Sequence, residues 1–462
     1  LQYPDVGQMN ISAAYTGTAG ALDAGLSMIG TGSFIAAPAS FLFSNLPAGP
    51  IKAGSAFSAT ISALNNAGAV TPNFGKESTP GPAGVTLTSN LVTPSGGANP
   101  TPGNNVLSGT EFGAGGMVSD SDGVATVNNL SWGEVGNISL LATLTNTYGY
   151  LGTATTPTKD TLNNLLIATG TSANVGAFIP DHFDTAVVAS ATTPMPCPTG
   201  LGCPVLYNGF VYSGQPFSMQ VTAKNQAGGI TTNYHSAYGL SHNVTLTAWD
   251  ALGSVVQQNP PGSGALGNGT LVSTAFNHGV GTTSTQTYTF AISPTTPTNI
   301  FLRAVDAINT SVTSRLANPA NSIEGGVRVV SGKVKLSNAH GPETLDLPMN
   351  ASVQYYDGTF WRTSLTDSVT SLTLNLSNYQ RKTGAWTTTP SPASGQIVAG
   401  ILSFILSAPT GGGTGSVDVG IGAPTYLLAG SNSAGDNPTL VGRATFGVYK
   451  GPNKFIYLRE VY

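Results

Sequence analysis

Hydrophobic and polar residues alternate over short stretches throughout the chain. The stretch from Phe57 to Ala63 has an apolar or small residue at every second position, and the same alternation recurs in many later segments. A strand with one face on a core and one in water has this pattern, because successive side chains point to opposite faces. The pattern predicts strands at residues 57–63, 85–88, 217–223, 244–247, 288–292 and 372–376.

Clusters of Gly, Pro, Asn, Ser and Thr separate these predicted strands at short intervals, which is typical of antiparallel sandwiches. Helical periodicity is nearly absent. The best candidate is Thr158–Ile167, where Leu162, Leu165 and Leu166 share a face, and it allows at most about two turns. The predicted fold class is all-β, built of tandem immunoglobulin-like antiparallel β-sandwich domains.

The chain contains an internal repeat. Residues 53–74 align without gaps with residues 213–234, and nine of the 22 aligned positions are identical. Both copies contain Asn-x-Ala-Gly, a turn signal in which glycine takes a positive φ between two strands. A Pro-x-x-Phe element, at Pro38 and at Pro180, precedes the two copies. The repeat therefore predicts two tandem sandwiches, at residues 37–178 and 179–326.

A second repeat links the start of the chain to the end of the first predicted sandwich. Leu1–Gly7 and Leu130–Gly136 share the pattern Leu, x, aromatic, x, acid, Val, Gly. In the later copy this element begins a late strand, so residues 1–36 are expected to hold the last strands of a preceding β domain plus a linker. Two origins stay open: a longer polypeptide that is truncated, cleaved or only partly ordered, or completion of a neighbouring subunit by residues 1–14 through strand addition.

The character of the sequence changes after the second predicted sandwich. Residues 327–462 are expected to form a third β domain. Near its end, Gly451-Pro452-Asn453 predicts the turn of a hairpin across Lys450–Lys454.

Composition narrows the function classes. Charged residues make up 8% of the 462 residues, against about 25% in ordinary soluble domains. Sixteen basic and twenty acidic residues give a net charge of -4, which excludes the basic surface that nucleic-acid binding requires. No apolar run reaches the roughly 18 residues of a membrane span. We expect a folded, turn-rich, extracellular protein without nucleic-acid partners.

The two cysteines, Cys197 and Cys203, are separated by five residues. A zinc site normally needs four Cys or His ligands, and no histidine is close in sequence. In an exported chain such a pair is expected to close into a disulfide, which would staple a hairpin or a leading loop and contribute about 2 kcal/mol.

The sequence points to no catalytic, cofactor or metal site. Its five histidines are scattered, and it lacks the zinc-protease and nucleophile-elbow motifs. Gly262–Gly267 fits a dinucleotide-binding pattern but is followed by no predicted helix, so the match is attributed to chance. Asp120-Ser121-Asp122-Gly123 fits either a hairpin turn or half of a calcium loop, with the turn favoured.

One aromatic group is a candidate contact surface. Tyr355, Tyr356, Phe360 and Trp361 form the densest aromatic cluster of the sequence, although core packing is the favoured alternative. Exposed tryptophans could also stack on sugars, whereas Trp132, which aligns with Tyr3 in the second repeat, is expected to be a corner or core residue.

Four stretches, at residues 71–80, 178–183, 332–348 and 442–462, make the chain resemble the C-terminal region of the MshQ family. These proteins are encoded with the mannose-sensitive haemagglutinin type IV pilus of Gram-negative bacteria. The family often has Asp-Ser-Cys-Thr where this chain has Asp367-Ser368-Val369-Thr370, so a family disulfide there is expected to be missing. The resemblance implies a cell-surface location near pili and no established activity.

The expected function is that of a non-enzymatic, exported cell-surface structural and adhesive protein, a stalk and assembly module associated with a type IV pilus. Its expected partners are other copies of itself or pilus components, with a surface glycan as a further candidate. Low charge favours such packing, because it removes repulsion between neighbours. The alternatives are a self-assembling subunit of an extracellular fibre or sheath, with residues 1–36 bridging subunits, and, less favoured, a carbohydrate-binding module.

Overall fold

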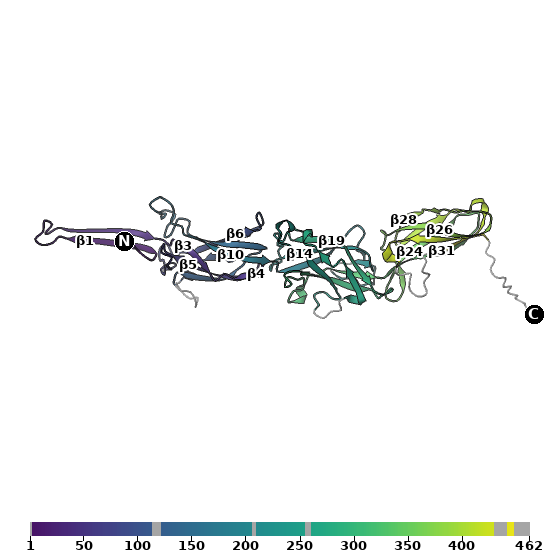
Figure 1. The fold of residues 1–462 in the computed structure, drawn as a ribbon, viewed down its shortest axis with the longest axis horizontal. Helices are drawn as coiled ribbons and strands as arrows, with labels where there is room; N and C mark the ends of the chain where they lie inside the picture. Colours follow the sequence, from purple (N-terminus) through teal and green to yellow (C-terminus); the bar gives the residue numbers. More distant parts are fainter. Residues whose placement is uncertain (1, 113–121, 206–208, 255–259, 429–440, 448–462) are drawn as a thin grey trace, which may run out of the picture. The chain divides into compact units, whose positions relative to one another are not determined.

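The computed structural model describes residues 2–112, 122–205, 209–254, 260–428 and 441–447 (Figure 1). Contacts divide the chain into two compact units. Unit 1 comprises Leu1–Phe183, Thr222–His242 and Ser273–Val280; unit 2 comprises Asp184–Val221, Asn243–Val272 and Gly281–Tyr462. The described elements are strands and a few short 3-10 turns, so the prediction of an all-β chain of tandem immunoglobulin-like sandwiches is confirmed.

The chain begins with a two-stranded antiparallel ribbon. Strands β1 (Gly7–Thr16) and β2 (Ser27–Ala36) pair along their whole length, from Gly7 opposite Ala36 to Thr16 opposite Ser27. Both strands belong to unit 1 and form a sheet of their own.

Sandwich 1 follows the ribbon within unit 1. Its smaller sheet has the order β3-β5-β8, with β3 (Ser40–Ser44), β5 (Phe57–Leu64) and β8 (Val124–Leu130). Its larger sheet has the order β4-β10-β9-β6-β7, with β4 (Ala48–Lys52), β10 (Thr169–Ile179), β9 (Gly136–Leu144), β6 (Val85–Thr93) and β7 (Val106–Leu107). All pairs are antiparallel except β4 with β10, which run parallel.

The core of sandwich 1 lies between these two sheets, where the alternating positions predicted from sequence are buried. Phe57, Ala59, Ile61 and Ala63 of β5 are all less than 10% exposed and face a cluster that includes Trp132 and Phe178. The rings of Trp132 and Phe178 meet edge to face at 5.1 Å. Burying large aromatic and β-branched side chains between two sheets is the main stabilising contribution in such a fold.

The segment Thr158–Ile167, the best helix candidate in the sequence, does not form a helix. The segment is a tight turn closed by the bridge between Lys159 and Leu165. The carboxylate of Asp160 accepts hydrogen bonds from the backbone N–H groups of Leu162 and Asn164, both at 2.8 Å. A short acidic side chain that captures nearby N–H groups competes with a helix, and this local competition outweighs the apolar spacing.

Sandwich 2 contains two sheets. One has the order β11-β14-β19-β16 with β18 also on β19, and the other has the order β12-β13-β21-β20-β15-β17. The strands of the first sheet are β11 (His182–Val188), β14 (Phe217–Lys224), β19 (Val280–Phe290), β16 (Gly264–Gly267) and β18 (Phe276–Asn277). Those of the second are β12 (Met195–Pro196), β13 (Gly209–Tyr212), β21 (Gly326–Val330), β20 (Thr298–Asp306), β15 (Val244–Trp249) and β17 (Thr270–Leu271).

The C-terminal sandwich belongs to unit 2. One sheet has the order β22-β24-β29-β27 with β25 also on β24, and the other has the order β23-β31-β30-β26-β28. The first contains β22 (Gly332–Leu336), β24 (Leu347–Tyr356), β29 (Ile401–Leu406), β27 (Pro390–Ser391) and β25 (Trp361–Thr363). The second contains β23 (Ala339–Gly341), β31 (Val441–Phe446), β30 (Thr414–Gly422), β26 (Ser371–Thr383) and β28 (Ser394–Gln396).

Seven 3-10 turns complete the described structure: η1 (Gly109–Phe112), η2 (Ser236–Tyr238), η3 (Pro261–Ser263), η4 (Ser273–Ala275), η5 (Pro319–Asn321), η6 (Thr410–Gly412) and η7 (Thr425–Leu427). Within the described ranges there is no helix with the length and apolar character needed to cross a membrane. The domain boundaries predicted from the repeats stay a prediction, and the predicted hairpin at Lys450–Lys454 lies outside the described residues.

Candidate functional site

The Asn-x-Ala-Gly repeat forms the same turn in both copies. The side-chain oxygen of Asn65 accepts a hydrogen bond from the N–H of Ala69 at 3.0 Å, and that of Asn225 accepts one from Gly229 at 2.8 Å. The glycines at the turns, Gly68 and Gly228, have φ of 77° and 81°, as the turn signal predicts. Because each amide oxygen is held by its own turn, the amide NH₂ group is left pointing away from it.

In both copies that NH₂ group donates to the second sequence repeat. Asn65 Nδ2 donates to the carbonyl oxygen of Pro4 at 2.7 Å, and Asn225 Nδ2 donates to the carbonyl oxygen of Gly133 at 3.0 Å. Pro4 and Gly133 are equivalent positions of the Leu-x-aromatic-x-acid-Val-Gly pattern. The two sequence repeats are therefore the two halves of one contact, which occurs twice within unit 1.

The acidic residue of the pattern completes this contact. Glu134 accepts hydrogen bonds from the N–H of Thr232 at 2.9 Å, the hydroxyl of Thr232 at 2.7 Å and the N–H of Asn233 at 3.0 Å. Its counterpart Asp5 accepts a hydrogen bond from the N–H of Asn73 at 3.1 Å. Hydrogen bonds to an ionised carboxylate are stronger than neutral ones, and three of these four satisfy a backbone N–H group of a turn.

We call these two contacts joint 1 and joint 2. Joint 1 comprises Pro4, Asp5, Asn65 and Asn73; joint 2 comprises Gly133, Glu134, Asn225, Thr232 and Asn233. They differ in burial, because Glu134 is 5% and Asn233 1% exposed, whereas Asn73 is exposed and Asp5 only half-buried. In joint 2 the backbone of Ala98 covers Asn233: its N–H donates to Oδ1 at 2.7 Å and its carbonyl accepts from Nδ2 at 2.8 Å.

Further contacts flank joint 2. The N–H of Gln226 donates to the carbonyl oxygen of Ala53 at 2.9 Å, and Lys52 Nζ donates to the carbonyl oxygen of Asp181 at 2.8 Å. The Asp181 carboxylate lies 2.8 Å from His182 Nδ1. This hydrogen bond, with a smaller contribution from the charge of Lys52, lowers the pKa of Asp181 below its ordinary value.

Unit 2 holds a third contact, made differently. The hydroxyl of Tyr212, from β13 of sandwich 2, donates at 3.1 Å to the buried carboxylate of Asp367 in the C-terminal sandwich. Asp367 also accepts from the N–H and the hydroxyl of Thr370, at 3.1 and 2.7 Å. Burial, followed by the charge of Asp367, raises the pKa of Tyr212. The Asp-Ser-Val-Thr segment is thus a buried carboxylate turn.

The predicted aromatic contact surface is divided by the β24–β25 hairpin. Tyr355 is buried, with its ring 6.0 Å from Phe210, while Tyr356 and Trp361 are half-buried neighbours at 5.5 Å. Phe360 is 62% exposed at the turn. Lys333 Nζ lies 4.3 Å above the Trp361 ring, a distance suited to a cation–π interaction.

Asp357 holds the turn that exposes Phe360. Its carboxylate accepts hydrogen bonds from the N–H groups of Thr359 and Phe360, at 2.8 and 2.6 Å, and from Arg362 Nε at 2.7 Å. The bond from the Phe360 N–H, followed by the one from Arg362, lowers the pKa of Asp357 to about 2.

The predicted disulfide between Cys197 and Cys203 is present, with a Cα–Cα distance of 6.2 Å. It follows β12, which pairs with β13, so it staples a hairpin loop, one of the two predicted locations. Of the calcium candidates, Asp120 lies outside the described residues and Asp122 pairs with Lys76. Gly123 has a φ of 79° directly before β8, which fits the turn alternative.

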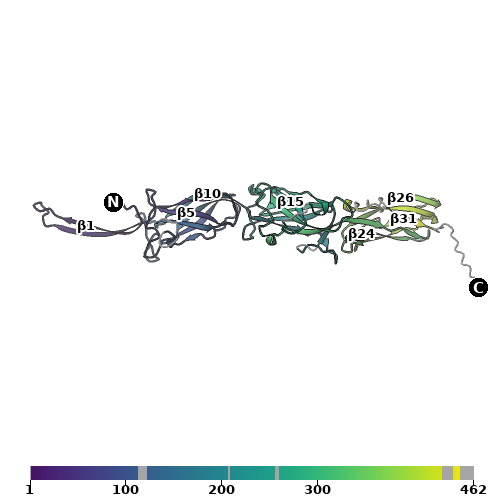
Figure 2. The same cartoon turned by 90° about the horizontal axis from the view of Figure 1, so that it is seen from below.

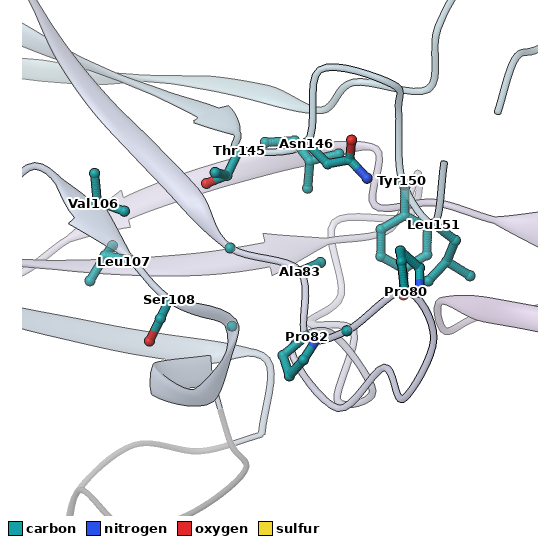
Figure 3. Close-up of a pocket in the computed structure, with 14 residues that line it drawn as sticks. Pro80, Pro82, Ala83, Val106, Leu107, Ser108, Thr145, Asn146, Tyr150 and Leu151 are labelled. Carbon is teal, nitrogen blue, oxygen red and sulfur yellow. The ribbon is translucent and has the colours of Figure 1, made fainter. Parts of the chain in front are cut away.

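The cavities of unit 1 differ in the groups that line them, and one of about 510 Å³ is bordered by Lys76, Glu77 and Tyr150. One of about 300 Å³ lies between the loops at Pro80–Gly84, Val106–Gly109 and Leu144–Leu151, and the side chains around it are drawn in Figure 3. None of its described lining residues is an acid, a histidine, a lysine or a cysteine. The hydroxyl of Tyr150 donates to Glu77 at 2.6 Å, and burial raises the pKa of this tyrosine.

Two of the five histidines come together, which sequence spacing did not predict. The rings of His235 and His278 stack at 4.4 Å, and His235 Nδ1 lies 3.1 Å from the carbonyl oxygen of Phe276. Among the described residues, no group of three or more His, Cys, Asp or Glu side chains is arranged to hold a metal ion. The Gly262–Gly267 segment is η3 followed by the edge strand β16, so no helix follows it.

Unit 2 contains a buried ion pair that the sequence did not reveal. Arg303 Nε donates to Glu324 Oε1 at 2.7 Å, and the guanidinium lies 3.4 Å from the centre of the Trp249 ring. The same carboxylate accepts hydrogen bonds from Ser314 Oγ at 2.9 Å and the N–H of Gly253 at 2.8 Å. Arg303 Nη2 donates to Glu324 Oε2 at 3.1 Å and to the carbonyl oxygen of Ser254 at 3.3 Å, and this set of contacts favours a structural role in holding sandwich 2 together.

Similar solved structures are remote. The D0-D1 domain of intimin is 10% identical, with a TM-score of 0.16, covering 51% of this chain and 94% of that chain. An alpha-2-macroglobulin of Escherichia coli, activated by porcine elastase, is 12% identical with a TM-score of 0.17. That match covers 95% of this chain but only 35% of the macroglobulin. A search of curated proteins found no significant match. These likenesses do not identify a function.

Family models give a specific result. The model described as DUF6701, second domain, matches residues 38–128, that of the third domain matches residues 134–325, and that of the fourth domain matches residues 330–461. The three matches occur in order and together cover most of the chain. The change of model after residue 128 falls just before joint 2, in the segment that carries Trp132 and Glu134. The chain belongs to the DUF6701 family.

Proposed function

We propose that this chain is a non-enzymatic, exported cell-surface protein that serves as a stalk and assembly module, associated with a type IV pilus of the mannose-sensitive haemagglutinin kind. The observation that carries the proposal is the joint that occurs twice. A protein that reuses one contact to attach successive β modules is suited to bearing load and setting spacing. Such a role requires strong contacts between modules and no nucleophile.

The chemistry of the joints supports this role. Each joint combines an asparagine amide with a carboxylate, and both groups bind backbone atoms of the facing module. Contacts of this kind depend on backbone positions, so they tolerate sequence change elsewhere in a sandwich while keeping the linkage. A low charge on the remaining surface supports packing against further protein, because little repulsion opposes it.

The link to a pilus rests on the resemblance of residues 71–80, 178–183, 332–348 and 442–462 to the MshQ family. The link is tested by immunolabelling intact cells of the source organism with antibodies against the full chain. The labelling is compared with that of lysed cells and of cells that lack the pilin subunit. We expect labelling of intact cells that is reduced or displaced without pilin. Labelling that requires lysis would refute the surface location, and labelling unchanged without pilin would refute the pilus association.

The fibre or sheath alternative predicts self-assembly. Light scattering of the full chain over a wide concentration range separates the two proposals, because a stalk module stays monomeric and a fibre subunit forms large species. If assembly occurs and residues 1–14 bridge subunits, deleting them abolishes it. The carbohydrate-binding alternative would be favoured by saturable binding on a glycan array that is lost in Trp361→Ala.

A further inference from the structure

A cavity of about 290 Å³ lies within unit 2, between segments of sandwich 2 and of the C-terminal sandwich. We propose that this cavity binds one neutral sugar residue of a glycan. The site is separate from the aromatic group at residues 355–361, and the proposal does not rest on the association with a pilus. It names a ligand that the stalk and assembly role leaves open, so its failure would leave that role untouched.

The cavity lies at the boundary of two sandwiches. On the side of sandwich 2 it is bordered by the residues after β13, the end of β19 and the loop that follows; on the other side it is bordered by the start of β22 and by η7. Ser331 alone connects β21 to β22, and the two sandwiches that it joins carry the labels β15 and β24 in Figure 2. Ligand sites occur preferentially at such boundaries, and this volume is near the lower end of the roughly 300–1,000 Å³ typical of ligand pockets, which suits a small ligand.

The lining is rich in hydroxyl groups. Six of its nine described residues carry one: Ser213, Thr289, Ser293, Ser331, Thr425 and Tyr426. None of the nine is an acid, a histidine, a lysine or an arginine. A charged ligand would therefore find no counter-charge, and an apolar ligand would leave buried hydroxyls without hydrogen bonds, which costs free energy. A neutral ligand with several hydroxyl groups of its own matches this lining.

Two of the serine hydroxyls are held in place by the backbone. Ser213 Oγ accepts a hydrogen bond from the N–H of Phe290 at 2.9 Å, and Ser331 Oγ accepts one from the N–H of Thr295 at 2.9 Å. A hydroxyl has two lone pairs and one hydrogen, so each serine is still able to donate to a ligand oxygen. Ser331 is only 1% exposed, and its carbonyl oxygen accepts a hydrogen bond from the N–H of Tyr356 at 2.9 Å. These donors are thus positioned before a ligand arrives, which lowers the entropic cost of binding.

Tyr426 adds an aromatic ring to the lining. Its ring stacks on the buried ring of Tyr212, with the centres 6.0 Å apart and the planes at 14°, so its orientation is fixed. Burial raises the pKa of Tyr426, which keeps its hydroxyl neutral at neutral pH. The C–H groups of a pyranose form an apolar face that packs on an aromatic ring, while its hydroxyls form hydrogen bonds. A sugar ring therefore uses both kinds of group that line the cavity.

The internal repeat supplies a comparison within the same chain. Ser213–Gly214 aligns with Ala53–Gly54 of sandwich 1. At the earlier glycine the space is filled by protein, because a Cβ there would lie 3.2 Å from the backbone nitrogen of Gln226. At the later glycine a Cβ would meet only Thr289 Oγ1 and Tyr426 Cβ, both at 3.6 Å and both part of the cavity lining. The second copy therefore has an open cavity where the first is filled, and a hydroxyl where the first has a methyl group.

The test is a ligand-observed NMR titration of the full chain. The probes are the methyl glycosides of glucose, galactose, mannose, fucose, N-acetylglucosamine and N-acetylgalactosamine, because a methyl glycoside keeps the ring of a terminal glycan residue. We expect saturable binding of at least one of them. The charged methyl glycosides of glucuronate and glucosamine should bind at least tenfold more weakly than the best neutral probe, because the lining offers no counter-charge.

Four variants locate the binding. Ser213→Ala removes one fixed donor and copies the residue that sandwich 1 has at this position, so it should fold normally and weaken binding about tenfold. Thr289→Trp, at an exposed position of β19, places a ring over the cavity and should abolish binding. The matched control Thr285→Trp adds the same ring on the same face of β19 but outside the cavity lining, and it should bind as the unmodified chain does. Trp361→Ala should also leave binding unchanged.

Absence of saturable binding to every neutral glycoside, equal binding of the charged glycosides, or binding that survives in both Ser213→Ala and Thr289→Trp would each overturn the proposal. Loss of binding in Trp361→Ala would place the site at the aromatic group and would also overturn it. The same titrations with the free sugars distinguish a glycan residue from a free monosaccharide. Binding of free sugars without binding of their methyl glycosides would contradict the assignment to a glycan.

Discussion

Replacing Glu134 with alanine should open joint 2 and leave the rest of the molecule folded. The carboxylate is 5% exposed and accepts three hydrogen bonds from Thr232 and Asn233, two of them from backbone N–H groups. Alanine removes the acceptor without removing these donors. Two N–H groups would then be left in a place that water reaches only if the joint opens.

The magnitude follows from these contacts. A hydrogen bond to a charged group contributes about 1.5–3 kcal/mol, and a buried donor left without a partner costs about 1–3 kcal/mol. Bonds that share one carboxylate are not additive, so we expect a loss of about 3 kcal/mol for Glu134→Ala. Glutamine keeps one acceptor oxygen, and for Glu134→Gln we expect about half of that loss.

Hydrogen exchange at the amides of Thr232 and Asn233 measures this loss where it occurs. Since 1.4 kcal/mol is a factor of ten, the alanine variant should exchange roughly a hundredfold faster at these two amides, and amides of β20 in unit 2 should not change. The matched control is Asp5→Ala at the half-buried joint 1, where the single bond to Asn73 should be worth about 1 kcal/mol or less. Unchanged exchange in Glu134→Ala, or an equal effect at both joints, would refute the role assigned to the buried carboxylate.

Three further outcomes are expected. Removing the buried carboxylate in Glu324→Ala should lower stability by about 3–5 kcal/mol in denaturant unfolding, because it leaves the guanidinium of its partner buried and unpaired; a loss below about 1 kcal/mol would contradict this. The carboxyl of Asp357 should titrate in NMR near its lowered pKa of about 2 and closer to the ordinary value in Arg362→Ala. Because folding lowers the pKa of Asp357, its ionised carboxylate stabilises the turn above the ordinary carboxyl pKa, and this stabilisation is lost as the pH falls through about 2. An unchanged titration midpoint of Asp357 in Arg362→Ala would rule out the ion pair as a cause of the lowered pKa. Reducing Cys197–Cys203 should cost about 2 kcal/mol locally and speed exchange in β12 and β13 only, whereas global unfolding would show that the disulfide holds the fold together.

Much of the fold follows from the sequence alone. The alternation at Phe57–Ala63 and Phe217–Ala223 specifies strands, because a period of two has only one structural solution that buries one face. The repeat of Asn-x-Ala-Gly predicts the same turn twice, and Gly68 and Gly228 adopt the positive φ that it needs. The spacing of Cys197 and Cys203 predicts their disulfide. These features are local, so neighbouring residues decide them.

Local reasoning failed where a side chain captured the backbone. At Thr158–Ile167 the apolar spacing favours a helix, but Asp160 holds two N–H groups in a turn. The same effect was missed at Asp367, where the carboxylate closes a turn and also receives the hydroxyl of Tyr212. Thr370, three positions after Asp367, is a signal that would have suggested the turn there, whereas Asp160 has no Ser or Thr at that spacing.

The sequence by itself determined that this protein is a series of sandwiches with repeated elements, because periodicity and turn chemistry act over a few residues. Only the tertiary structure decided that the two repeats contact each other, bringing Glu134 onto residues 232–233, about a hundred positions away in sequence. The tertiary structure alone also buried Tyr355 while leaving Phe360 exposed, and it paired Arg303 with Glu324. Composition and spacing identify side chains that are able to make contacts. Which of them meet, how deeply they are buried and how they are oriented is set only when the sheets pack and bring together residues that are remote in the chain.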